Sequence, residues 1–197
     1  MDDSTLPTVL AALTRGPRHP VREAADAVPS AAGLYAIHGD AAAFGELGTG
    51  GADRPLYVGK AERSLAGRDL RTHFATGRTG SSTLRRTLAA LLREPLALRA
   101  VPRNPARPDG SATYALAPEG DERLTAWMRA RLCISVWRGP AGADLAGIET
   151  AVLRAVRPSL NLAGMGSAAD PRIRAARAAM AAEARSGSGG DRAYGPG

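Results

Sequence analysis

Three short β-strand candidates, far apart in the chain, place the strongest constraint on its fold. They cover residues 33–37, 55–59 and 133–137, and the first is bounded by small residues before it and by His38-Gly39-Asp40 after it. Only a Gly/Ala-rich segment, residues 40–54, separates the first two, so these two strands are predicted to form a hairpin with a long tip. Helical segments separate the third strand from the hairpin. The pattern predicts an α/β protein with a small sheet.

The helical segments are recognised by leucine spacing and by their capping residues. Ser81 or Ser82 precedes a run in which leucines recur at three- and four-residue intervals up to residue 92, typical of an amphipathic helix. Further helices are predicted over residues 6–13, 64–74, 121–132, 144–156 and 171–184. The proline-rich residues 95–109 are predicted to form a loop.

Length and composition exclude several classes of protein. With 197 residues and 44% hydrophobic residues, the chain is long enough for one domain with extensions. It has no apolar run of the ~18 residues that a membrane helix needs, and its acidic start differs from a signal peptide. We therefore expect a cytoplasmic protein that does not enter a membrane. Cys133 is the only cysteine, which excludes an internal disulfide, and three histidines with one cysteine are too few for a closed zinc site.

The charge balance favours a polyanionic partner. Lysine and arginine number 26 against 19 acidic residues, which gives a net charge of +7, and Lys60 is the only lysine. Such a surplus is typical of proteins that bind nucleic acid. Two predicted helices carry clustered arginines, and these either contact a DNA backbone or form a solvated face. The arginines are Arg85, Arg86 and Arg93 in one helix and Arg172, Arg174 and Arg177 in the other.

Five elements along the chain resemble, in their order, the motifs of the GIY-YIG endonuclease family. They are Gly33-Leu34-Tyr35, Tyr57-Val58-Gly59-Lys60, Arg68 with Arg71 and His73, Glu149, and Arg157-Pro158-Ser159-Leu160-Asn161. The resemblance covers about residues 31–164. It implies an α+β domain in which a small three-stranded antiparallel sheet is flanked by helices. Around this domain we expect an N-terminal arm (1–30), a C-terminal Ala/Arg helix (165–185) and a disordered tail (186–197).

The resemblance also implies an activity and a set of site residues. The activity is divalent-metal-dependent hydrolysis of phosphodiester bonds, and we expect DNA to be the substrate. Tyr57 or Tyr35 would position or deprotonate the attacking water, and Lys60 would lower the pKa of that tyrosine. Arg68, or Arg71 in its place, would contact the scissile phosphate, and Glu149 would bind Mg²⁺ or Mn²⁺. The remaining expected site residues are His73 and Asn161.

Elementary chemistry is consistent with these roles. A free tyrosine titrates near pH 10, so a tyrosinate base at neutral pH needs cations close by. Magnesium keeps several waters and commonly binds one or two protein carboxylates plus a substrate phosphate, which suits a lone Glu149.

Structural interpretations stay open beside the functional ones. The two tyrosines are also suited to packing on a strand, Glu149 to a half-buried ion pair with an arginine, and Asn161 to capping a turn. The 22-residue interval from Tyr35 to Tyr57 is long for the family, which makes the hairpin tip an insertion. Two other functions compete with a nuclease: a nucleic-acid-binding module that lacks catalysis, and a protein-interaction scaffold that uses the long tip.

Overall fold

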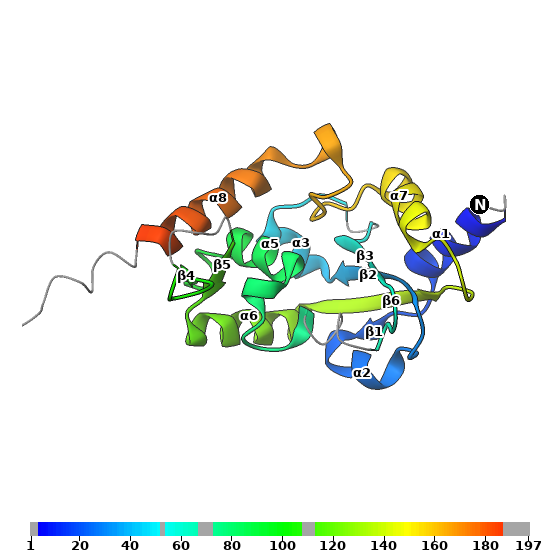
Figure 1. Cartoon of the computed structure of the whole chain (residues 1–197), viewed down its shortest axis with the longest axis horizontal. Helices are drawn as coiled ribbons and strands as arrows, with labels where there is room; N and C mark the ends of the chain where they lie inside the picture. Colours follow the sequence, from blue (N-terminus) through cyan, green and yellow to red (C-terminus); the bar gives the residue numbers. More distant parts are fainter. Residues whose placement is uncertain (1–3, 52–53, 67–72, 108–112, 187–197) are drawn as a thin grey trace, which may run out of the picture.

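Short strands alternate with helices, and the computed structural model describes residues 4–51, 54–66, 73–107 and 113–186. Figure 1 shows the elements in their spatial arrangement. In chain order they are α1 (Thr5–Arg15), β1 (His19–Pro20), η1 (Val21–Glu23), α2 (Ala24–Ala27), β2 (Gly33–Gly39), α3 (Ala41–Leu47), β3 (Tyr57–Ala61), η2 (Thr79–Ser81), α5 (Thr83–Leu91), β4 (Ala100–Pro102), β5 (Tyr114–Leu116), α6 (Pro118–Arg131), β6 (Leu132–Arg138), α7 (Leu145–Val156), η4 (Gly166–Ala168) and α8 (Pro171–Ser186).

The main sheet contains the three predicted strands in antiparallel arrangement. Its order is β1-β6-β2-β3, so the strand that comes last in the sequence lies next to the first strand of the hairpin. The predicted three-stranded antiparallel sheet is therefore confirmed, and the two-residue β1 extends it at one edge. The predicted N-terminal arm contributes both β1 and α1, and α1 packs on β6 and α7.

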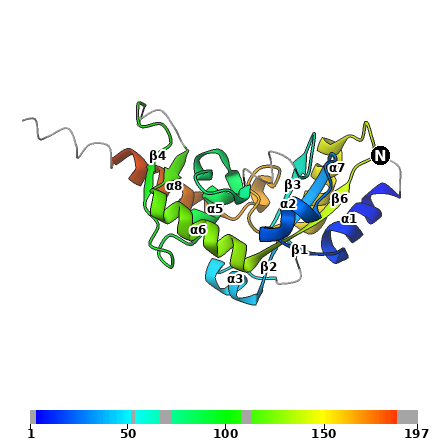
Figure 2. The same cartoon turned by 90° about the horizontal axis from the view of Figure 1, so that it is seen from below.

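Alternating side chains on β2 separate two cores. Leu34 and Ala36 point to the face that α1 and α7 cover, whereas Tyr35 and Ile37 point to a larger core shared with α3, α5, α6 and α8. Figure 2 shows that α8 and the two-stranded sheet β4-β5 gather at the opposite end of the molecule from α1. The sheet is thus covered on both faces, and Tyr35 belongs to the larger core.

The glycine of the second motif has a steric explanation. Tyr35 on β2 pairs with Gly59 on β3, and a Cβ on Gly59 would lie 2.5 Å from the Tyr35 hydroxyl oxygen. The tyrosine ring therefore lies over the glycine backbone, and any side chain at position 59 would displace it.

Two segments that were predicted to be irregular contain regular structure. In the hairpin tip, Asp40 accepts a hydrogen bond from the Ala43 N–H at 2.8 Å and begins α3, which ends at Gly48 in a left-handed conformation. The predicted loop 95–109 contains β4, which pairs with β5. Both elements are short and stabilised by distant packing partners, which local sequence patterns do not reveal.

The arginines of α5 correct a second expectation. Both interpretations placed Arg85 and Arg86 on a solvent-facing surface, but Arg85 is fully buried and Arg86 is only 8% exposed. The predicted N-cap is correct, since the Ser82 hydroxyl accepts the Arg85 N–H at 3.1 Å. Both guanidinium groups are buried because other segments supply polar partners: α6 to Arg85, and the carbonyls of η2 to Arg86.

Asp121 is the partner that makes the burial of Arg85 possible. The Arg85 Nη2 lies 2.9 Å from the Asp121 carboxylate, and both side chains are almost inaccessible to solvent. The same carboxylate accepts hydrogen bonds from the Gly77 N–H and the Thr79 hydroxyl. Asp121 was predicted only as a favourable residue in the first turn of a helix. Its charge instead joins α6 to α5 and to the segment before η2.

Some predicted features fall outside the described residues. These include most of the predicted helix over residues 64–74 and the predicted tail after residue 186. Within the described part of the chain, no helix is both long and apolar enough to cross a bilayer.

Removal of the Asp121 charge should destabilise the fold strongly. Asp121→Asn leaves the Arg85 guanidinium buried without its counter-charge, which is expected to lower the free energy of unfolding by about 3–5 kcal/mol. Urea unfolding followed by circular dichroism measures this loss. Glu119→Gln, at an exposed position of the same helix, serves as the control. A loss below about 1 kcal/mol for Asp121→Asn would contradict the structural role assigned to the pair.

Candidate active site

Three aromatic side chains from separate segments form the centre of the candidate site. Tyr35 on β2, Tyr57 on β3 and His73 have ring centroids 5.9–6.3 Å apart, and each ring is tilted against the other two. The Tyr35 hydroxyl and His73 Nε2 are 2.8 Å apart and hydrogen-bonded. The structure therefore brings together three of the residues that the sequence identified.

His73 is held by groups of α5. Its Nδ1 lies 2.6 Å from the Ser82 hydroxyl, the same group that caps α5. Its backbone carbonyl accepts a hydrogen bond from Arg85 Nη1 at 3.2 Å. Burial, and next the positive charge of Arg85, lower the pKa of His73 from 6.5 to about 4. The imidazole is therefore neutral at neutral pH, with one ring nitrogen donating and the other accepting. The sequence predicted Ser82 as a cap but gave no sign of its contact with His73.

Tyr57 differs from Tyr35 in having an uncommitted hydroxyl. No described residue forms a hydrogen bond with this hydroxyl, and the side chain is half-buried. Burial, followed by the negative charge of Glu149, raises the pKa of Tyr57 to about 12, while Arg177 opposes this increase. In this state Tyr57 is a neutral phenol. Among the described residues, Arg177 on α8 is a cation that favours its ionised form. The sequence offered this arginine only as a contact to a DNA backbone or as part of a solvated face.

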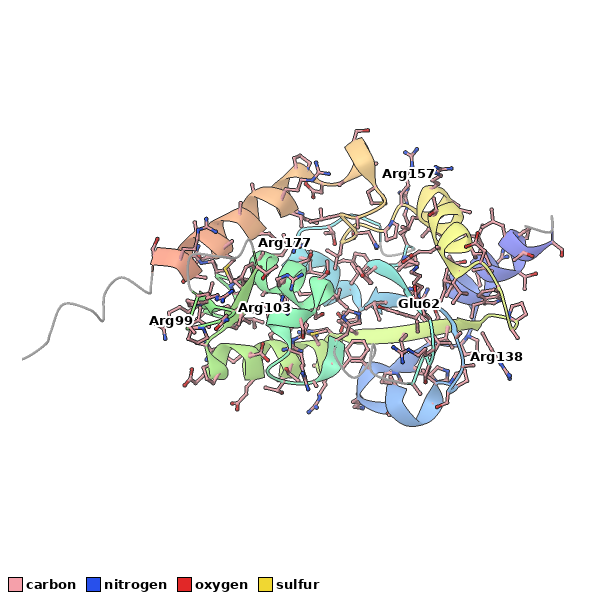
Figure 3. All side chains as sticks on the ribbon, viewed as in Figure 1. Glu62, Arg99, Arg103, Arg138, Arg157 and Arg177 are labelled. Atoms are coloured by element: carbon pink, nitrogen blue, oxygen red, sulfur yellow. The ribbon has the colours of Figure 1, made fainter. Side chains whose placement is uncertain are left out.

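Glu149 projects from α7, which packs against β3 and β2. Its side chain is half-buried, and burial raises the pKa of its carboxyl, with Lys60 opposing and Glu62 adding to the increase. None of the ion pairs in the described part of the chain involves Glu149, so the alternative of a pair with an arginine has no support there. Lys60 itself pairs with Glu62 at 3.0 Å, and Figure 3 labels Glu62 beside the sheet.

Glu149 and Glu62 fit a magnesium-like ion only if that ion takes few of its ligands from the protein. Among the described residues, no three histidine, cysteine or carboxylate side chains come together as a metal cage. Glu149 nevertheless carries a desolvated carboxylate without an ion-pair partner in that part of the chain, a group that a cation would stabilise. Mg²⁺ commonly takes one or two protein carboxylates, its other ligands being waters and substrate phosphate oxygens. The donor set is therefore compatible with Mg²⁺ or Mn²⁺ at Glu149.

Asn161 supports the site from behind. Its Oδ1 accepts the Val58 N–H at 2.9 Å, and its Nδ2 donates to the Val58 carbonyl at 2.8 Å. Because β3 is an edge strand, these two backbone groups would otherwise lack a partner from the sheet. Asn161 is 6% exposed. Asn161 therefore holds β3 at Val58, between Tyr57 and Gly59.

Two of the predicted site residues cannot be located relative to this cluster. Arg68 and its alternative Arg71 both lie outside the described residues.

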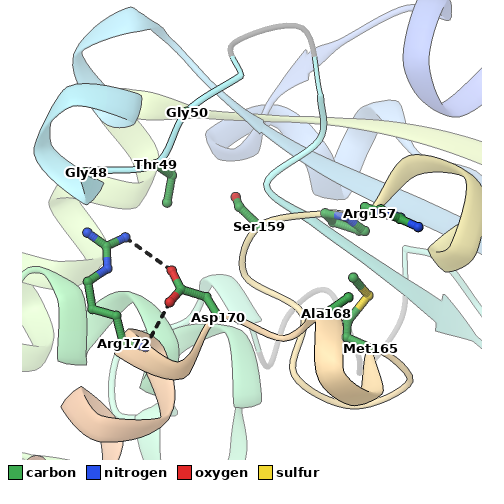
Figure 4. A pocket seen from close by; sticks show the side chains of 10 residues that line it. Gly48, Thr49, Gly50, Arg157, Ser159, Met165, Ala168, Asp170 and Arg172 are labelled. Carbon is green, nitrogen blue, oxygen red and sulfur yellow. Dashed lines mark hydrogen bonds and ion pairs between the residues drawn. The ribbon is translucent and has the colours of Figure 1, made fainter.

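A separate hollow lies between the hairpin tip and the turn that leads to Asn161. Figure 4 shows Thr49 from the tip, Ser159 and Arg157 from the turn, and Asp170 paired with Arg172. The hydroxyls of Thr49 and Ser159 are buried and have no hydrogen-bond partner among the described residues. Its described lining includes none of the seven predicted site residues.

The neutral state of His73 predicts a loss of stability in acid. Because the folded-state pKa of about 4 lies below 6.5, the unfolded chain binds the proton more readily. The contribution of His73 is complete above about pH 6.5 and is lost as the pH falls toward 4; the full difference is about 3 kcal/mol. Burial also lowers the pKa of His38 to about 4. The contribution of His73 must therefore be measured by comparing the parent with a His73 variant.

Urea unfolding between pH 7 and pH 4 should show a weaker pH dependence for His73→Gln than for the parent. The imidazole resonances of the folded parent provide an independent measurement. A His73 resonance that titrates near pH 6.5 in the folded protein would contradict the prediction.

Comparison with known proteins places this geometry in a family. Residues 46–180, about two thirds of the chain, match the model of the GIY-YIG catalytic domain. The searches of curated proteins and of solved structures gave no significant match. The match extends from the hairpin tip through β3, Glu149 and Asn161 into α8, and so it includes most of the residues described above. The chain therefore belongs to the GIY-YIG catalytic domain family, a family of endonucleases.

Proposed function

We propose that this protein is a divalent-metal-dependent endonuclease that hydrolyses phosphodiester bonds in DNA. The observation that carries the proposal is the cluster of Tyr35, Tyr57 and His73, in which the charge of the half-buried Glu149 acts on Tyr57. Glu149 forms no ion pair with a described residue. Membership of the family supports nuclease activity in general. The net charge of +7 favours a polyanionic substrate.

Glu149 is the residue proposed to hold the metal. A bound divalent cation would neutralise charge on the phosphate and lower the pKa of a coordinated water. Compensation of the Glu149 charge would also remove one of the two effects that raise the pKa of Tyr57. Lys60 holds Glu62 in an ion pair and reduces the repulsion between Glu62 and Glu149.

Tyr57 is proposed to orient the attacking water and accept its proton. Its hydroxyl has no hydrogen bond to a described residue and is therefore available to a water molecule. With a pKa of about 12 the resting group is protonated, so it first acts by orientation. Proton acceptance requires the positive charges of the occupied site, among them Arg177.

Tyr35 is proposed to have a different task, because its hydroxyl is bound to His73. A histidine with a pKa of about 4 is a weak base, and it serves best as a fixed hydrogen-bond partner. The Tyr35–His73–Ser82 connection thus positions the ring of Tyr35 against Tyr57. On this proposal Tyr57 participates directly in proton transfer and Tyr35 acts through position.

Loss of Glu149 should abolish nicking of supercoiled plasmid in Mg²⁺ or Mn²⁺. Glu149→Gln keeps the shape of the side chain but removes the charge, and the cleavage rate should fall by about 10²-fold or more. Calorimetry in the absence of DNA should show that Glu149→Gln also binds Mn²⁺ more weakly than the parent. Glu119→Gln is the matched control at an exposed position. Cleavage by the parent that continues in EDTA would contradict metal dependence, and a parent that binds DNA without cleaving it would favour a non-catalytic binding module.

The phenylalanine variants of Tyr57 and Tyr35 should differ in their cleavage rates. Tyr57→Phe removes the group proposed to handle the proton and should reduce the cleavage rate by about 10²- to 10⁴-fold. Tyr35→Phe removes one positioning hydrogen bond and should cost less. Tyr114→Phe, whose hydroxyl binds a backbone carbonyl of α5, controls for loss of a buried phenol. A larger loss for Tyr35→Phe than for Tyr57→Phe would reverse the assignment.

A further inference from the structure

Three arginines from different elements lie near one another, and two of them contact η2. Arg86 belongs to α5, Arg103 directly follows β4, and Arg177 lies on α8, which packs against both α5 and β4. Gly80 joins two of them: its carbonyl accepts a hydrogen bond from Arg86 Nη1 at 2.8 Å, and a Cβ at this glycine would lie 3.1 Å from Arg103 Cγ. Figure 3 labels Arg103 and Arg177 in the same region.

This cluster brings three positive charges together. Within the described part of the chain, none of the three arginines is ion-paired with a carboxylate, in contrast to Arg85, which precedes Arg86 directly. Arg86 is 8% exposed, and its Nε is buried and has no hydrogen-bond partner among those residues. Burial, then the charges of Arg177 and Arg103, lower the pKa of Arg86. A buried cation that lies among other cations is costly unless an anion joins it.

The cluster adjoins the candidate active site. Tyr114 lies beside Arg86, because its hydroxyl donates to the Arg86 carbonyl at 2.5 Å. Arg177 acts electrostatically on both Tyr114 and Tyr57. Arg177 is therefore the member of the cluster whose charge acts on the tyrosine proposed to orient the attacking water.

We propose that Arg103 and Arg177, with the buried charge of Arg86 behind them, bind a phosphate of the nucleic-acid backbone. The proposal deepens the proposed function and rests on nucleic acid being the substrate. Guanidinium groups match phosphate oxygens in geometry and charge, and such contacts fix the position of a duplex without reading its sequence. A phosphate here supplies a negative charge that no ion pair among the described residues provides.

Salt dependence of binding tests this inference separately from catalysis. The probe is a fluorescent 20-base-pair DNA duplex, with anisotropy measured in EDTA between 50 and 200 mM KCl. Each lost phosphate contact should reduce the slope of log K against log salt by about 0.9. Arg103→Gln and Arg177→Gln should each show this change and bind several-fold more weakly. Arg15→Gln, at the exposed end of α1 and far from α8 (Figure 1), removes the same charge and is the control.

Each outcome decides the inference. Slopes and affinities of both variants equal to those of Arg15→Gln would overturn it, as would a parent that does not bind the duplex. A parent that binds with the expected slope but never cleaves would overturn the proposed function while leaving this inference intact. Both DNA and RNA offer backbone phosphates. An RNA duplex of the same sequence is therefore measured in parallel, to distinguish a DNA substrate from an RNA substrate. Thermal unfolding of each variant verifies that the fold is retained.

Discussion

The buried ion pair between Arg85 and Asp121 is the interaction on which the rest of the structure depends most. It joins α5 to α6, and the same guanidinium donates to the backbone carbonyl of His73. Ser82, at the start of the same helix, holds the imidazole of His73. The position of the aromatic cluster is therefore coupled to a charge pair in the protein interior, and the fold and the candidate site share one polar network.

The sheet supplies the second requirement, which is the placement of two tyrosines on one face. Antiparallel pairing puts Tyr35 opposite Gly59 and Ile37 opposite Tyr57, so the tyrosines lie diagonally across β2 and β3. The absence of a side chain at Gly59 leaves room for the Tyr35 ring. Asn161 then satisfies the open edge of β3. A short edge strand is in this way fixed beside the aromatic cluster.

Predictions from local patterns were accurate where a local interaction sets the structure. The serine cap of α5, the helix beginning after Asp144 and the strand that ends near Trp137 all follow from short-range signals. They failed where a distant partner changes the environment of a side chain. Arg86 and Arg85 follow a polar helix pattern, and only the carboxylate and carbonyls of other segments allow their burial. In the same way, β4 depends on pairing with β5.

The sequence by itself determined the order of the strands and helices, the motif residues and the surplus of positive charge. These properties depend on residue type and on spacing along the chain. Only the tertiary structure decided that Tyr35 binds His73 whereas the Tyr57 hydroxyl bonds to none of the described residues, that Asn161 holds β3, and that Arg177 lies close enough to influence Tyr57. Hydrogen bonds and electrostatic effects depend on distances between segments, and those distances are fixed only when the two cores on either side of the sheet are packed.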